Sequence, residues 1–312
     1  MVCGGFLGWD ALALLDRLGI DTAKLGAHPI SRVRVFAGRR TAEAALPRRA
    51  VGLSRRALDA TLLAHAADAG AAVERGTGVR AIDADARATL TDGTEVAAER
   101  LFVATGKHRL RGVVRPHGAS AGLRATLSPS PSLARALDGC IELHLLDRGY
   151  AGLLLQEDGS ANLCLSVAAE RLAGGVDALL AELALEAPRL AERIAAARAD
   201  PCWISVAGVP YGWRTARTTA GVYRLGDQAA VIASLAGDGV AIALASGLAA
   251  SRSPSAADFQ RNFARRTAAP IRLAEALRRA AERPRLARPA LGLLAHAPGL
   301  MTLGARLTRA GH

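Results

Sequence analysis

The sequence has few aromatic residues and no long apolar run. Aromatic residues make up 4% of its 312 residues, too few for the stacking platforms that bind single-stranded nucleic acids. A membrane-spanning helix needs about 18 or more consecutive apolar residues. The two best candidates, 229–250 and 289–305, are interrupted by Asp238 and by His296 with Pro298. These absences argue against a nucleic-acid-binding protein and against a membrane span.

Lysine is also nearly absent, although the net charge is +12. Lys24 and Lys107 are the only lysines. The segment from Arg261 to the C-terminus contains eleven arginines but only two acidic residues, Glu275 and Glu282. The simplest interpretation of this basic run is a solvated helical face. The alternative is attraction to an anionic membrane surface or an acidic partner. No nucleic-acid partner is expected, because no recognition motif accompanies the charge.

Metal-ligand patterns are missing as well. Cys3, Cys140, Cys164 and Cys202 form no C-x-x-C pair and none lies near a histidine at ligand spacing, so no metal site is predicted. All four lie in apolar runs, which indicates buried thiols and a reducing compartment. We therefore expect a cytoplasmic protein, with contact at the inner face of the membrane as the alternative for its basic tail.

Hydrophobic residues make up 51% of the chain and charged residues 22%, which is typical of a globular protein with a sizeable core. Periodicity and turn residues predict helices at 9–18, 55–69 (capped by Ser54) and 240–250, and over most of the last sixty residues. Two further helices are predicted across 175–198, with Pro188 starting the second. Strands are predicted at 30–36, 72–74, 79–82, 88–90, 101–104, 202–206 and 222–225. Four further strands, at 122–128, 140–146, 152–155 and 161–167, are consecutive and predict an antiparallel sheet.

Two nearby segments contain residue types that are suited to binding a ligand. The strand 222–225 ends at Gly226-Asp227, and Gly237-Asp238-Gly239 opens a helix. Amide groups at a helix N-terminus favour anionic oxygen, and glycines let a flat ligand approach the backbone. A carboxylate such as Asp227 accepts hydrogen bonds from sugar-like hydroxyls. The alternative is a plain turn followed by a helix cap.

Five segments in order resemble one family. They are 2–4 (VCG), 54–59 with 70–71 and 76–79 (SRRALD, GA, GTGV), 102–106 (FVATG), 222–230 (VYRLGDQAA) and 237–243 (GDGVAIA). Together they resemble the flavin-dependent oxidoreductases of the para-hydroxybenzoate hydroxylase superfamily, especially its geranylgeranyl reductase-like branch. The resemblance implies FAD as cofactor and NADH or NADPH as reductant.

The resemblance also implies roles for individual residues, although it identifies no catalytic residue. Asp227 is expected to bind the ribityl hydroxyls, and Arg55 the phosphate or ribityl part. The loop of Gly237, Asp238 and Gly239 is expected to face the flavin pyrimidine carbonyl, with Cys3 and Gly4 beside the isoalloxazine ring. Val79 is expected to contact adenine through its backbone, and Thr105 and Gly106 to pass close to the dinucleotide.

The sequence departs from this family at its start. The family opens with a strand, a G-x-G-x-x-G turn, a helix and a second strand, a unit of about 30 residues, and no such unit is found here. We expect a truncated gene model, and the alternative is a degenerate, cofactor-free protein that binds a partner. Ala233 and Ser234 also stand where the family often has proline.

The predicted fold is α/β (α+β overall). It consists of a Rossmann-like FAD-binding domain (1–115 and 200–250) that lacks its first βαβ segment, an antiparallel-sheet substrate domain (116–199, with strands from 28–50) and a basic helical region (251–312). The predicted reaction is monooxygenation or carbon–carbon double-bond reduction of a hydrophobic small molecule. Tyr150, Tyr211, Trp203 and Trp213 are either substrate-wall residues or ordinary core and rim aromatics.

Overall fold

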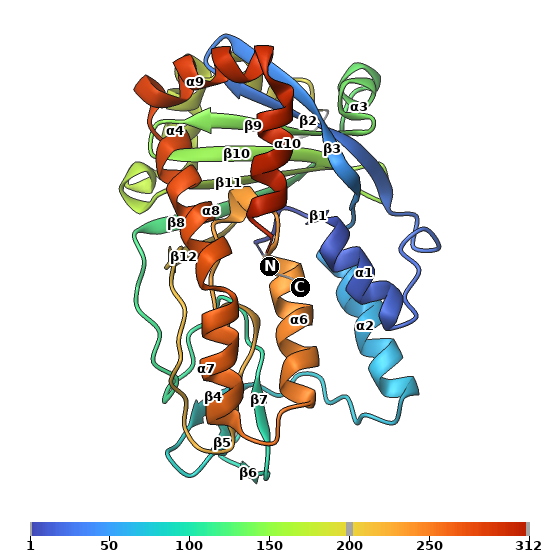
Figure 1. Cartoon of the computed structure of the whole chain (residues 1–312), viewed down its shortest axis with the longest axis vertical. Coiled ribbons are helices and arrows are strands. Elements are labelled where there is room, and N and C mark those ends of the chain that lie inside the picture. The colour runs from blue at the N-terminus through green and yellow to red at the C-terminus, as the bar shows by residue number, and fades with distance from the viewer. Residues whose placement is uncertain (1, 198–201, 310–312) are drawn as a thin grey trace.

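An eight-stranded mixed sheet is the largest element of the computed structural model, which describes residues 2–197 and 202–309 (Figure 1). Its strand order is β1-β3-β2-β9-β10-β11-β8-β12. The strands are β1 (Phe6–Leu7), β2 (His28–Ala37), β3 (Arg40–Gly52), β8 (Ser120–Leu127), β9 (Cys140–Leu146), β10 (Gly149–Leu155), β11 (Ala161–Ala168) and β12 (Ile204–Val209). Among the described strands of this sheet, only β2 and β9 pair in parallel, so residues about a hundred positions apart become neighbours in the middle of the sheet.

Short turns build the central hairpins. β9, β10, β11 and β8 pair antiparallel, as the four consecutive strand patterns predict. Asp158 and Gly159 turn β10 into β11, and Gly159 has a φ of 76°, a conformation that glycine adopts at little cost. β9 alternates between fully and partly buried residues along its length, because successive side chains of a strand point to opposite faces of the sheet.

Helices cover both faces of this sheet. One face packs on α3 (Pro131–Leu137), α4 (Gly175–Glu186) and α5 (Pro188–Ala195) through a large aliphatic core that includes Leu153 and Leu163. On the other face, α9 (Pro284–His296) and α10 (Pro298–Leu307) pack on β2 and β3 through Leu291 and Met301. Figure 1 shows α10 running in front of β9 and β10.

The remaining elements form a second, smaller half. It contains a parallel pair, β7 (Leu101–Val103) with β13 (Val222–Arg224), and an antiparallel sheet of β4 (Val79–Ile82), β5 (Arg87–Leu90) and β6 (Glu95–Ala97). Its helices are α1 (Trp9–Arg17), α2 (Arg55–Asp68), α6 (Gly239–Ser251) and α7 (Ala256–Arg266), and α8 (Ala268–Ala281) leads back to the large sheet.

β7 is paired on one side only among the described strands. Strands inside a parallel sheet are normally buried on both faces, yet Phe102 of β7 is 42% exposed. The Rossmann-like half therefore has a reduced parallel sheet, as the sequence predicts from its lack of a first βαβ segment. The α/β class with a large additional sheet is confirmed.

Several local predictions need correction. Residues 72–74 form no strand, because that segment has no partner strand in the described part of the chain. The strand predicted at 202–206 is β12, which begins two residues later and ends at Val209. The two helices predicted across 175–198 are α4 and α5, and the second begins at Pro188 as expected; α5 ends at Ala195, and residue 198 lies outside the described residues. Cys140 is buried as expected, Cys3 and Cys164 are half-buried, and Cys202 is exposed, which the buried-thiol expectation missed.

The described residues contain neither a candidate membrane-spanning helix nor a candidate metal-binding cluster. None of their helices is long and apolar enough to span a bilayer. None of their His, Cys, Asp and Glu side chains gather in groups of three or more that could hold a metal ion.

Candidate functional site

A cavity of about 920 Å³ lies between the large sheet and the helices α6, α8, α9 and α10. Seven of the predicted cofactor-binding residues line it, from five separate stretches of chain: Cys3, Gly4, Arg55, Gly106, Asp227, Gly237 and Gly239. The two glycine-and-carboxylate segments therefore meet each other and also meet the end of β7. This convergence is the main geometric result, because no local pattern places these stretches together.

Asn162 of β11 positions the N-terminal segment. Its side-chain amide donates to the backbone oxygens of Cys3 (3.1 Å) and Gly4 (2.7 Å), and its side-chain oxygen accepts from Arg124 (2.6 Å). The backbone N–H of Leu53 donates to the oxygen of Gly5 (2.9 Å). These bonds fix Cys3 and Gly4 at the junction between the large sheet and the cavity.

Two side chains join the loop after β7 to the loop after β13. The Gln228 amide donates to the backbone oxygens of Gly106 and His108 (both 2.8 Å) and to the hydroxyl of Thr105 (3.0 Å). Arg115 donates to the backbone oxygens of Gly106 (3.3 Å) and Asp227 (3.4 Å). Because Gln228 is buried, these bonds hold the two loops in a fixed relation.

Lys107 places a cation in the cavity. Its ammonium group donates to the backbone oxygen of Val2 (3.2 Å). Burial disfavours the charge of this side chain, but Asp227 together with Tyr211, Cys3 and Cys164 outweighs burial, so the pKa of Lys107 lies above its usual value. The cavity thus contains the Asp227 carboxylate and a persistent ammonium group, and the half-buried Arg55, which pairs with Asp59, also lines it.

The glycines leave room for a flat group. Gly237 has a φ of 68°, and a Cβ there would lie 2.7 Å from the Phe6 ring. At Gly4, Gly106 and Gly239 a Cβ would meet nothing within 4 Å, so their backbones border open space in the cavity. α6 begins at Gly239, so its free N–H groups favour negative charge at this edge of the cavity.

Three predicted residues are not among the described residues that line the cavity. Thr105 faces Gln228 instead, and Val79 is an exposed residue of β4. Asp238 is buried at the start of α6 and forms an ion pair with Arg309 (3.2 Å), whose guanidinium lies over Trp9. Asp238 thus ties the C-terminal segment to α6.

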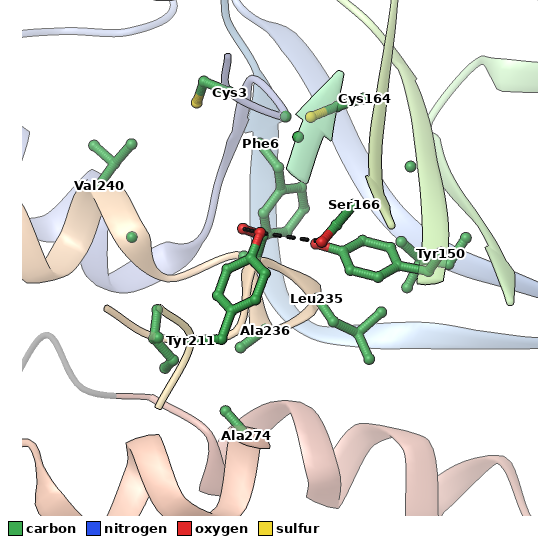
Figure 2. A pocket seen from close by; sticks show the side chains of 18 of the residues that line it. Cys3, Phe6, Tyr150, Cys164, Ser166, Tyr211, Leu235, Ala236, Val240 and Ala274 are labelled. Atoms are coloured by element: carbon green, nitrogen blue, oxygen red, sulfur yellow. Dashed lines mark hydrogen bonds between the residues drawn. The ribbon is translucent and has the colours of Figure 1, made fainter. Parts of the chain in front are cut away.

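The sheet side of the cavity carries a small group of hydroxyls (Figure 2). The Tyr211 hydroxyl lies 3.2 Å from Ser166 Oγ and 2.9 Å from Ser234 Oγ. Figure 2 shows the hydroxyl ends of Tyr150 and Tyr211 directed toward one another. Burial raises the pKa of Tyr150 well above its usual value and that of Cys164 on the same wall to about 12. This wall is therefore uncharged at neutral pH.

The aromatic residues divide between the two interpretations. Tyr150 and Tyr211 line the cavity. Trp203 packs against the aliphatic core beneath the sheet, and Trp213 lies under the Arg224 guanidinium. The wall interpretation fits the tyrosines, and the core or rim interpretation fits the tryptophans.

Sequence reasoning missed Lys107, Arg115, Asn162 and Gln228. A usable signal existed for Lys107, which is one of two lysines in the chain and follows Thr105-Gly106 directly. Gln228 follows Asp227 in the same way. Arg115 and Asn162 gave no signal, because most of their partners are backbone oxygens, which no residue type in the sequence marks.

Comparisons with known proteins agree with this fold. Klebsiella pneumoniae HpxO, solved in complex with FAD and uric acid, is 17% identical with a TM-score of 0.70, covering 97% of this chain and 86% of that chain. A geranylgeranyl bacteriochlorophyll reductase-like protein from Thermoplasma acidophilum is 17% identical with a TM-score of 0.72, covering 94% and 80%. PqsL, a probable FAD-dependent monooxygenase from Pseudomonas aeruginosa, is 16% identical with a TM-score of 0.66, covering 92% and 89%.

No protein-family model and no curated protein matches the sequence. The comparisons therefore show that this chain shares its fold with HpxO, with PqsL and with the reductase-like protein. The likeness in fold to these flavoproteins, which the five sequence segments suggest, is confirmed at this level.

Proposed function

We propose that this chain binds FAD and is a flavin-dependent oxidoreductase acting on a hydrophobic small molecule. The observation that carries the proposal is the convergence of Asp227, Gly237 and Gly239 with Gly106 and the Cys3-Gly4 segment on one cavity. A solved neighbour of the same fold holds FAD. A cofactor-free binding module has no need of this convergence.

The residues present fit the ring and ribityl parts of FAD. Open space beside Gly4, Gly106 and Gly239 suits a flat ring that touches backbone, and Asp227 accepts hydrogen bonds from ribityl hydroxyls. The first N–H groups of α6 stabilise negative charge on the pyrimidine side. The cation of Lys107 lines the same cavity as Asp227. Arg55 also lines the cavity, where its guanidinium is suited to bind the ribityl or phosphate part of FAD.

Bound FAD supplies hydride and electron transfer, with NADH or NADPH as the reductant. Two reactions fit this chemistry, monooxygenation and reduction of a carbon–carbon double bond. Substrate-dependent oxygen consumption separates them. Oxygen uptake that follows substrate supports monooxygenation, whereas anaerobic reoxidation of the reduced protein by an alkene supports double-bond reduction.

The cavity wall points to the substrate class. Valine, leucine and isoleucine side chains of β2, β9 and β10 line most of the sheet side, so the body of the substrate is apolar. The uncharged hydroxyls of Tyr150, Ser166, Tyr211 and Ser234 offer hydrogen bonds to a neutral oxygen. A matched ligand pair tests this: a long-chain alcohol is expected to stabilise the protein against heat more than the corresponding alkane, and Tyr211→Phe is expected to reduce the difference.

The decisive experiment for the cofactor is simple. The purified chain is mixed with FAD, separated from free ligand and examined for the visible absorbance of oxidised flavin. We expect retained colour, lost in Asp227→Ala and kept in the control Asp158→Ala, which alters an exposed turn outside the cavity. A chain that stays colourless after FAD addition overturns the proposal and supports the cofactor-free alternative.

A further inference from the structure

The helices α8, α9 and α10 carry exposed leucines that a solvated helical face does not need. Six large apolar side chains there are at least two-fifths exposed: Leu277, Leu286, Leu293, Leu300, Leu303 and Leu307. Solvent-facing helix surfaces are normally polar, and gathered apolar exposure marks an interaction surface. On α10, Leu300, Leu303 and Leu307 recur at helical spacing, so they form one stripe.

Unpaired positive charge accompanies these leucines. In the described part of the chain, Arg283, Arg285 and Arg306 are exposed and form no salt bridge with a carboxylate. Arg278 differs, because Glu275 and Glu282 neutralise it. The surface that remains outward is therefore both apolar and cationic, the combination that binds an anionic lipid surface.

The exposed leucines continue into the cavity. Leu277, Leu286 and Leu300 are exposed and also line the cavity, as do the small residues Ala280 and Ala290 between them. Because these residues are both exposed and part of the cavity lining, α8, α9 and α10 border an apolar mouth of the cavity. A surface that only bound an acidic protein would not need an apolar path into the interior.

We infer that the outward face of α8, α9 and α10 docks on an anionic lipid bilayer, with the mouth of the cavity turned toward the membrane. The leucines enter the interface between headgroups and acyl chains, and the exposed arginines bind lipid phosphates. An apolar ligand then passes from the bilayer to the cavity without crossing water. This docking does not depend on the chain binding FAD.

Sedimentation with vesicles tests the inference. The full chain is mixed with vesicles of phosphatidylcholine, or of phosphatidylcholine with phosphatidylglycerol, at low and high salt. We expect binding that requires phosphatidylglycerol and weakens with salt. Each arginine near an anionic surface contributes about 1 kcal/mol, so the triple variant Arg283→Ser, Arg285→Ser, Arg306→Ser is expected to bind on the order of 100-fold more weakly.

Matched controls separate local docking from bulk charge. The triple variant Arg17→Ser, Arg75→Ser, Arg217→Ser removes the same charge from exposed positions elsewhere and is expected to bind like the unaltered chain. Leu293→Ser, at a side chain 72% exposed, is expected to weaken binding about tenfold, whereas Leu185→Ser on α4, 89% exposed, is not. Circular dichroism verifies that each variant is folded.

The inference is overturned if the unaltered chain does not bind vesicles that contain phosphatidylglycerol. It is also overturned if the two triple arginine variants weaken vesicle binding equally. Vesicle binding is measured with and without added FAD. A colourless protein that still binds vesicles contradicts the proposed enzyme function and leaves the docking surface intact.

Discussion

The two halves of this molecule differ in how completely their sheets are covered. In the large sheet, Leu153 and Leu163 are fully buried under α3, α4 and α5. In the other half, β7 has one partner strand, and apolar side chains such as Phe102 and Val96 remain exposed. One face of the large sheet is closed by its own helices and the other lines the cavity, whereas the smaller half leaves apolar side chains of its strands exposed.

This difference indicates which half of the molecule contributes most to stability and which contributes most to ligand binding. The large sheet is built from consecutive hairpins and has a continuous aliphatic core, which favours stability. The smaller half depends on Gln228 and Arg115, which join loops across the chain. Loops held by a rigid scaffold are common places for binding groups. We therefore expect substitutions in the large sheet to change stability and substitutions in the loops to change ligand binding.

The largest expected effect tests the unequal cores. Leu163→Ala in the large sheet is expected to lower the free energy of unfolding by about 2–5 kcal/mol. Leu110→Ala, in the small cluster beside β4 and β7, is expected to cost less, because the surroundings of Leu110 are partly open and relax more easily. Urea denaturation followed by circular dichroism measures both. Equal losses in the two variants contradict the comparison.

The second prediction concerns acid. Burial alone raises the pKa of Glu142 in β9, but His144 and Arg193 outweigh burial and hold it at about 2. Since this pKa lies below the ordinary 4.5, Glu142 stabilises the fold above about pH 4.5, and the contribution is lost as the pH falls toward 2. The shift corresponds to about 3 kcal/mol.

Denaturation at a series of pH values measures this acid sensitivity. Glu142→Gln is expected to be less stable at neutral pH, because Arg34 and Arg193 lose their carboxylate. The variant is also expected to show a flatter decline between pH 4.5 and 2. A decline as steep as that of the unaltered chain means that other groups govern acid unfolding.

A pair of glycine substitutions sharpens the contrast between stability and binding. Gly237→Ala is expected to cost about 1–3 kcal/mol, because it forces a side chain into a left-handed backbone conformation and against Phe6. Gly239→Ala meets no neighbour and is expected to keep its stability while binding FAD more weakly, since its Cβ enters the cavity. Thermal unfolding and flavin retention measure the two effects. Full flavin binding by Gly239→Ala argues against the proposed ring position.

The smallest effect concerns a helix cap between the halves. Ser54 Oγ accepts from the N–H of Ala57 (3.1 Å), and the hydroxyl donates to Glu157 (2.5 Å). Ser54→Ala is expected to cost about 1 kcal/mol. Ser54→Thr keeps both bonds and serves as the control. A thermal shift in Ser54→Thr as large as in Ser54→Ala would assign the loss to packing.

Sequence reasoning was most successful where the signal is local. Ser54 and the periodic pattern after it predict α2, and the apolar strand patterns on either side of Asp158-Gly159 predict the hairpin of β10 and β11. α3 was missed, because seven residues give a weak periodic signal. The strand expected at 72–74 was wrong, because three apolar residues define a strand only where a partner exists.

The candidate site shows the same division. The sequence singles out Asp227 and the glycines by their residue types and by their order along the chain. It does not indicate that Asp238 forms an ion pair with Arg309, or that the Asn162 amide donates hydrogen bonds to the backbone oxygens of Cys3 and Gly4. Those contacts join residues more than seventy positions apart, so no spacing rule reaches them.

By itself, then, the amino-acid order determined the helices, the hairpins and the chemistry that glycine and carboxylate bring to a loop, because these follow from neighbours within a few residues. Only the folded chain decided which loops share one cavity, that Lys107 lines the same cavity as Asp227, and that exposed leucines border the opening. The physical reason is that burial, charge proximity and solvent exposure depend on distances in space, which packing of the whole chain sets.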